Sequence, residues 1–110
     1  MVIQHKELAE GRWRRLSFVE AMANIGSEVE RAMKWRAKKN PAYAELAFNR
    51  ALELIDLTLQ CTREFPRLKE TARMREVLLD YFYGQNEYHS TDQAWSRYFT
   101  QFTLAARPHV

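Results

Sequence analysis

Arginine and tryptophan side chains follow one another near the start of the chain, between residues 12 and 15. Guanidinium groups pair bidentately with phosphates, and an indole can stack on an unpaired base. The candidate polyanion-binding residues are therefore Arg12, Trp13, Arg14, Arg15 and Lys38. The alternative is structural: Trp13 packs onto the protein, while the arginines stay solvated or meet acidic groups such as Glu53 and Asp56.

A second group of reactive side chains lies between residues 80 and 92, where acid, amide, phenol and imidazole groups share one connection. A small-molecule pocket or an acid/base site needs such groups together. The alternative is again structural: Gly84 and Asn86 form the turn, Ser90 caps the next helix, and the tyrosines cover the end of the fold. With one arginine from the preceding helix, the candidate small-ligand or anion-binding residues are Arg75, Tyr81, Asn86, Tyr88, His89 and Asp92.

Arg75 is a candidate because it falls within an apolar arc of its helix. A buried guanidinium must be paired, since a lone buried charge costs several kcal/mol. Its partner could be Asp56 or Glu53 in a structural ion pair, or it could be an anionic ligand. The long side chain could also reach solvent at the edge of the arc.

The sequence contains no Gly-rich phosphate loop, no His pair at metal-binding spacing, and no spacing that we recognise between a nucleophile and a base. We therefore predict no catalytic residues, no metal and no cofactor, and a protein that is not an enzyme. The net charge of +3 is too small to imply nucleic acid by itself. The single cysteine, Cys61, rules out an internal disulfide and fits a reducing compartment.

The elements that position these groups follow from the hydrophobic pattern. Residues 41–61 are apolar everywhere except on one narrow strip, so this helix must be covered on about three sides. Strand-like alternation is absent, and five of the six glycines and prolines stand where helical periodicity breaks. The 110 residues fit one domain, residues 1–110. The pattern predicts an all-α protein, an antiparallel four-helix bundle with helices at about 18–39, 41–61, 66–83 and 91–106, preceded by a short helix or arm over residues 1–10.

Local signals predict how these helices begin and end. Ser17 and Glu20 have the spacing of a capping box, and Asn40 with Pro41 is typical of a helix start. Gly84 predicts a left-handed C-terminal cap. Either Ser90 or Thr91 is expected to cap the last helix, and Ser90 with Gln93 has the spacing of a second capping box. Gly26 costs about 1 kcal/mol inside a helix, which the close approach of a neighbouring helix could offset. In the third predicted helix, the apolar face is expected to run along Leu68, Ala72, Leu79 and Phe82.

Several apolar residues lie outside the stripes that a single bundle needs. Patches of this kind often mark interfaces, and cyclic dimers are the commonest oligomers. The interface candidates are Leu46, Leu57, Val77 and Leu104. They predict a protein that associates with itself, as a homodimer.

Three resemblances follow from these residues. Residues 28–56 resemble a tetratricopeptide-type helical hairpin, with Ala32, Trp35, Ala44 and Phe48 at the family's spacing, which implies a groove for a peptide. However, no copy recurs about 34 residues later. The whole chain is similar to a family of small prokaryotic all-helical proteins to which no activity is assigned. It also looks like the HEPN-class bundles, but it lacks their ribonuclease pattern of an Arg shortly before a His.

Our first functional hypothesis is a non-enzymatic helical-bundle protein that works by association, chiefly with itself. The alternative is an accessory nucleic-acid or nucleotide-binding protein that uses residues 12–15. No apolar run reaches the ~18 residues of a membrane span, and the first residues lack the order of a signal peptide, so we expect a cytoplasmic protein.

Overall fold

The structure, a computed structural model, describes residues 11–107. Residues 11–14 are helical, and four long helices follow. These are α2 (Phe18–Ala37), α3 (Pro41–Cys61), α4 (Phe65–Tyr83) and α5 (Asp92–Ala106). The all-α prediction is confirmed, and the predicted boundaries hold to within two residues. The predicted arm over residues 1–10 lies outside the described part of the chain.

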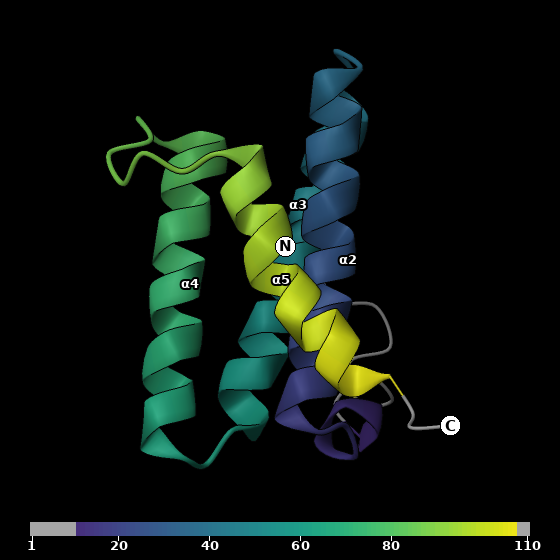
Figure 1. Ribbon diagram of the computed structural model, residues 1–110, viewed down its shortest axis with the longest axis vertical. Helices are drawn as coiled ribbons and strands as arrows, with labels where there is room; N and C mark the ends of the chain where they lie inside the picture. Colours follow the sequence, from purple (N-terminus) through teal and green to yellow (C-terminus); the bar gives the residue numbers. More distant parts are fainter. Residues whose placement is uncertain (1–10, 108–110) are drawn as a thin grey trace.

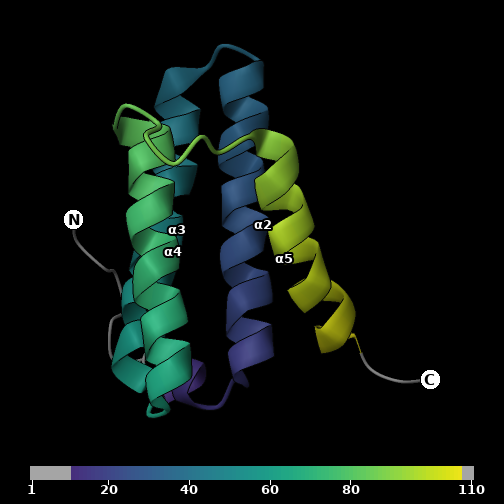
Figure 2. The same cartoon turned by 60° about the vertical axis from the view of Figure 1, so that its left-hand side comes forward.

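The helices alternate in direction along the chain (Figure 1). α2 packs against both α3 and α5, and α3 packs against α4. Figure 2 shows α2 between α3 and α5. α4 and α5 approach each other less closely than these neighbours do, and their ribbons separate below the loop that joins them (Figure 1). Side chains of α4 and α5 and the connecting loop line the space between these two helices.

Two of the predicted helix starts are present as expected. The Ser17 Oγ accepts a hydrogen bond from the Glu20 amide at 3.1 Å, and the Glu20 Oε1 accepts one from the Ser17 amide at 3.0 Å. The bond from the Ser17 amide, followed by a contact with the Ser17 side chain, lowers the pKa of Glu20, because both favour the charged carboxylate. The Asn40 Oδ1 accepts from the Tyr43 amide at 3.1 Å, with Pro41 at the first helical position.

Other predicted ends are wrong. Of the two N-caps that the sequence allowed for α5, the structure selects Thr91, whose Oγ1 accepts from the Ala94 amide at 3.1 Å, so the capping box predicted for Ser90 and Gln93 is wrong. Gly84 has a φ of −102°, so it is not left-handed. A Cβ there would lie 2.9 Å from the Cα and carbonyl oxygen of Asp80, so Gly84 is needed for close approach instead. α2 ends two residues earlier than predicted, close to Lys39, whose φ of 62° is incompatible with a continuing helix.

A single main core joins all four helices. α4 contributes Met74 and Leu78 to it, on a line with the buried Thr71, whose hydroxyl donates to the Arg67 carbonyl at 2.7 Å. Ala72 is exposed, so the apolar line predicted for this helix is rotated from the one observed. The other members of the core are Met22, Ile25, Val29, Ala32, Met33, Ala47, Phe48, Ala51, Leu52, Ile55, Trp95 and Phe99.

Gly26 lies where α2 and α5 cross. A Cβ at this position would stand 2.6 Å from the Cβ of Phe99 and 2.8 Å from its Cγ. The Phe99 Cβ is bonded directly to the backbone of α5, so a change of side-chain rotamer cannot move it away. The expected close approach of a neighbouring helix at Gly26 is therefore confirmed, and the neighbour is α5.

Candidate functional site

Trp13 is buried rather than available for stacking. Its side chain joins Ala21 and Leu57 in a second, smaller apolar cluster at the end of the bundle. The indole Nε1 donates to the Thr58 Oγ1 at 2.9 Å, so its polar atom is also satisfied. In this conformation Trp13 packs onto α3, and the stacking role that the sequence suggested for it is wrong.

The arginines around Trp13 remain at the surface. Arg12, Arg14 and Arg15 are all exposed. A pocket of about 290 Å³ places Arg14 beside Arg63 and Arg67, two arginines that sequence reasoning did not select. They were missed because they lie about 50 residues later, and only the packing of the helices brings them to the same end of the bundle.

Lys38 is separated from that cluster. It follows the last residue of α2, whereas the arginines around Trp13 precede the first. A helix of this length spans about 30 Å, so the two groups lie at opposite ends of α2. The Lys38 Nζ instead lies 5.2 Å from the centre of the Trp35 ring. The structure therefore does not assemble Lys38 with the rest of the predicted polyanion set.

Arg75 has a protein partner. Its Nε donates to the Asp56 Oδ1 at 2.9 Å, across the interface of α3 and α4. Both side chains remain about one third exposed, at 35% and 34%. A partly solvated pair of this kind contributes less than about 1 kcal/mol. Of the partners that the sequence allowed, the structure selects Asp56.

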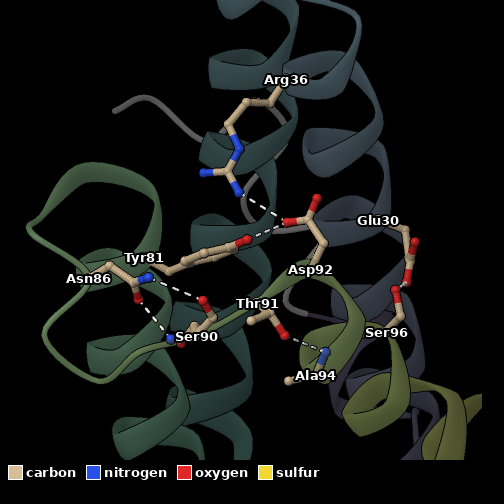
Figure 3. A network of polar contacts seen from close by, with 9 residues as sticks. All are labelled: Glu30, Arg36, Tyr81, Asn86, Ser90, Thr91, Asp92, Ala94 and Ser96. Atoms are coloured by element: carbon tan, nitrogen blue, oxygen red, sulfur yellow. Dashed lines mark hydrogen bonds and ion pairs between the residues drawn. The ribbon is translucent and has the colours of Figure 1, made fainter.

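Two of the loop candidates hold the helix ends together (Figure 3). The Asp92 carboxylate accepts a hydrogen bond from the Tyr81 hydroxyl and one from the Arg36 guanidinium, the latter at 3.1 Å. The Arg36 guanidinium carbon also lies 4.5 Å from the centre of the Tyr81 ring. Partial burial, followed by the contact with Asp92, raises the pKa of Tyr81. This network ties the start of α5 to the ends of α2 and α4.

Asn86 stabilises the fold of the loop itself (Figure 3). Its φ of 55° is left-handed, which asparagine tolerates better than most residues. The Asn86 Oδ1 accepts from the Ser90 amide at 2.8 Å, and its Nδ2 donates to the Ser90 carbonyl at 3.1 Å. The Asp80 carboxylate accepts from the amides of Glu87 and Tyr88 at 2.9 and 3.1 Å. Asn86 therefore holds Ser90 in the loop, which explains why the next residue, Thr91, is the N-cap of α5.

The remaining loop candidates, Tyr88 and His89, line a groove of about 380 Å³ between α4 and α5, which we call the α4–α5 groove. Its floor is mainly apolar, and an apolar hollow of this size could receive a small organic group. The other lining residues are Glu70, Arg73, Met74, Val77, Ser90, Ala94, Trp95 and Tyr98. Sequence reasoning missed the helical members, because no local signal tells which faces of α4 and α5 meet.

Phenol groups at the rim of the α4–α5 groove are tied to carboxylates. The Tyr98 hydroxyl donates to the Glu70 Oε2 at 2.6 Å, and the Tyr88 hydroxyl donates to the Glu76 Oε1 at 2.8 Å. Burial, then the contact with Glu70, raises the pKa of Tyr98 well above its ordinary value. The pKa of Tyr88 is raised by its bond to Glu76. Both phenols therefore stay protonated at neutral pH and act as donors.

The interface candidates have different environments. Leu46 and Leu104 are strongly exposed, at 62% and 56%. Val77 is half-buried in the α4–α5 groove. Leu57 is only 1% exposed, so its assignment to an interface is wrong. The physical reason is that Trp13 covers this flank of α3, which a helical wheel of α3 alone leaves bare.

Within residues 11–107, no three His, Cys, Asp or Glu side chains gather so that they could hold a metal ion. In the same part of the chain, no helix combines the length and apolarity that crossing a bilayer requires. Comparisons of the chain with protein-family models, with curated proteins and with solved structures found no match. The fold thus defines an all-α helical-bundle protein, and the resemblances drawn from the sequence stay predictions.

Proposed function

We propose that the protein works by association, and that its first partner is a second copy of itself. The single observation that supports this proposal is an exposed apolar face at the start of α3. Tyr43 is 51% exposed and Leu46 is 62% exposed, one turn apart on the same helix. The Tyr43 ring packs edge-on against Trp35 of α2, with centroids 4.8 Å apart, so the aromatic part of the face is held in place.

The shape and charge of this face suit a two-fold interface. Leu46 stands at the edge of a hollow of about 150 Å³, which Trp35 and Ala47 also line. In a two-fold dimer the same patch meets itself, so each Leu46 could enter the partner's hollow. The rim carries Glu28 together with Arg31 and Arg50, charges of both signs, as a self-complementary patch requires. One carboxylate oxygen of Glu28 is buried without a hydrogen-bond partner among residues 11–107, and a donor from a second copy would satisfy it.

Replacing Leu46 with glutamate tests this interface. We expect the native protein to be a dimer by light scattering, and Leu46→Glu to weaken dimerisation by about 100-fold or more, since each dimer would bury two unpaired carboxylates. Leu46 is exposed, so circular dichroism should show unchanged helix content. The matched control is Leu104→Glu, an equally exposed leucine on α5, which should remain dimeric. A native protein that stays monomeric at high micromolar concentration would contradict the proposal.

A second candidate function is binding to nucleic acid through the exposed arginines near Trp13. The observation that favours it is the convergence of five arginines from two parts of the chain on one end of the bundle: Arg12, Arg14, Arg15, Arg63 and Arg67. Such binding should weaken linearly on a plot of log affinity against log salt.

We expect that the variant Arg12→Gln with Arg15→Gln reduces the salt slope on a single strand by about 1.4, which is about 0.7 for each lost phosphate contact. Fluorescence anisotropy with short single-stranded RNA and DNA would measure it. Lys38→Gln, at the other end of α2, is the control and should leave the slope unchanged. Binding that does not respond to salt, or no binding, would reject this second candidate.

A further inference from the structure

The pocket beside Trp13 has the composition of an anion site. It lies where the segment before α2 meets the link from α3 to α4, and its volume is about 290 Å³. Its charged lining residues are three cations, Arg14, Arg63 and Arg67, and one anion, Glu64. Within residues 11–107, the single ion pair among them joins the Arg67 Nη1 to the Glu64 Oε1 at 3.3 Å. The pocket therefore has a surplus of guanidinium groups.

The position of Arg67 is set by a second contact. Its guanidinium carbon lies 5.1 Å from the centre of the Phe18 ring, so the ring supports one face of the group. One nitrogen of this guanidinium is engaged by Glu64, and its remaining N–H groups can donate to the oxygens of a phosphate. Arg14 and Arg63 are exposed and form no ion pair in the described part of the chain. They can thus turn toward a ligand at little cost.

The start of α4 adds to the positive potential. Glu64 is the N-cap of α4, but its side chain makes no capping hydrogen bond, and Pro66 has no amide hydrogen. The amides of the first turn therefore leave the positive end of the helix dipole unneutralised by a cap beside the arginines. This feature only reinforces the arginine cluster, which would attract an anion without it.

Apolar side chains also line the pocket. They are Leu16, Phe18, Ala21 and Cys61. We propose that the pocket binds a phosphate monoester that carries a small apolar or aromatic group, with Arg14, Arg63 and Arg67 around the phosphate and Phe18 against the organic part. This inference goes beyond self-association, and it requires no binding to a nucleic-acid chain. The phosphate could belong to a free metabolite-sized ester or to the phosphorylated end of a nucleic acid.

Titration calorimetry on the full chain at low salt separates these possibilities, with phenyl phosphate, inorganic phosphate and benzoate as probes. We expect phenyl phosphate to bind best, because it alone offers both a dianionic phosphate and a ring. Arg63→Gln should weaken its binding about tenfold, since a charged hydrogen bond is worth about 1.4 kcal/mol or more. Arg97→Gln, which removes an exposed arginine of α5 outside the pocket, is the matched control and should leave binding unchanged.

A pair of short single-stranded oligonucleotides, with and without a 5′ phosphate, then identifies the source of the phosphate. Tighter binding of the phosphorylated one, lost in Arg63→Gln, assigns the pocket to nucleic-acid ends. Equal binding of the two, with phenyl phosphate still bound, assigns it to free esters and leaves the second candidate function to its own salt test. The proposal is overturned if no phosphate probe binds, if benzoate binds as well as phenyl phosphate, or if Arg97→Gln weakens binding as much as Arg63→Gln does.

Discussion

Replacing Trp13 with alanine should lower the free energy of unfolding by about 3–5 kcal/mol. The change removes a buried indole together with its hydrogen bond to Thr58, and it uncovers Leu57. Domains of this size are stable by only about 5–15 kcal/mol, so the loss is a large part of the total. Urea unfolding followed by circular dichroism at the helical band measures it directly.

Two companion variants show which part of the effect comes from packing. Trp13→Phe keeps most of the apolar contact and loses the donor, so its cost should be about 1–2 kcal/mol. Thr58 keeps one bond there, because its hydroxyl also donates to the Leu54 carbonyl at 2.8 Å. Arg14→Ala, a change to the exposed neighbour, should stay within about 0.5 kcal/mol of the native protein. If Trp13→Ala were no more harmful than Arg14→Ala, the burial of the indole would be refuted.

Alanine at Gly26 should destabilise the protein by about 1–3 kcal/mol, although alanine is the better helix former by about 1 kcal/mol. The cause is steric, since the new Cβ would stand 2.6 Å from the Phe99 Cβ and either α2 or α5 would have to move. Denaturant unfolding of Gly26→Ala gives the value. Gly11→Ala is the control, because a Cβ at Gly11 has no neighbour within 4 Å.

A double-mutant cycle with Phe99 makes this second prediction sharper. Phe99→Ala by itself should cost about 3–5 kcal/mol, because Phe99 is a buried core residue. It removes the Cγ and Cδ1 atoms that a Cβ at Gly26 would meet, but it keeps the Phe99 Cβ at 2.6 Å. In that background Gly26→Ala should therefore cost less than in the native protein, by about 0.5 kcal/mol or more, a difference that additive effects cannot produce. Additive free energies would show that α2 and α5 do not cross at Gly26.

Features that depend on short-range interactions along the chain were predictable from the sequence, and features that depend on long-range contacts were not. The capping box of Ser17 and Glu20 and the start of α3 at Asn40 and Pro41 depend on residues three or fewer positions apart, so the sequence alone predicts them. The sequence leaves the cap of α5 open between Ser90 and Thr91, because both side chains can cap a helix and the choice depends on how Asn86 holds Ser90 in the loop. The residues that make up the candidate sites were harder to predict than the helix ends. Each combines side chains from segments that only the packing of the helices brings together.

The amino-acid sequence alone is enough to predict the helices and their bounds to within two residues, because the hydrophobic period is encoded within single segments. Which helix faces meet depends on the packing of the folded protein. That choice buried Trp13 over Leu57, placed Asp56 against Arg75, and brought Arg14 together with Arg63 and Arg67. A helix with a wide apolar surface can be covered by several different neighbours. The arrangement of lowest free energy therefore depends on the packing of the whole bundle and not on any one helix.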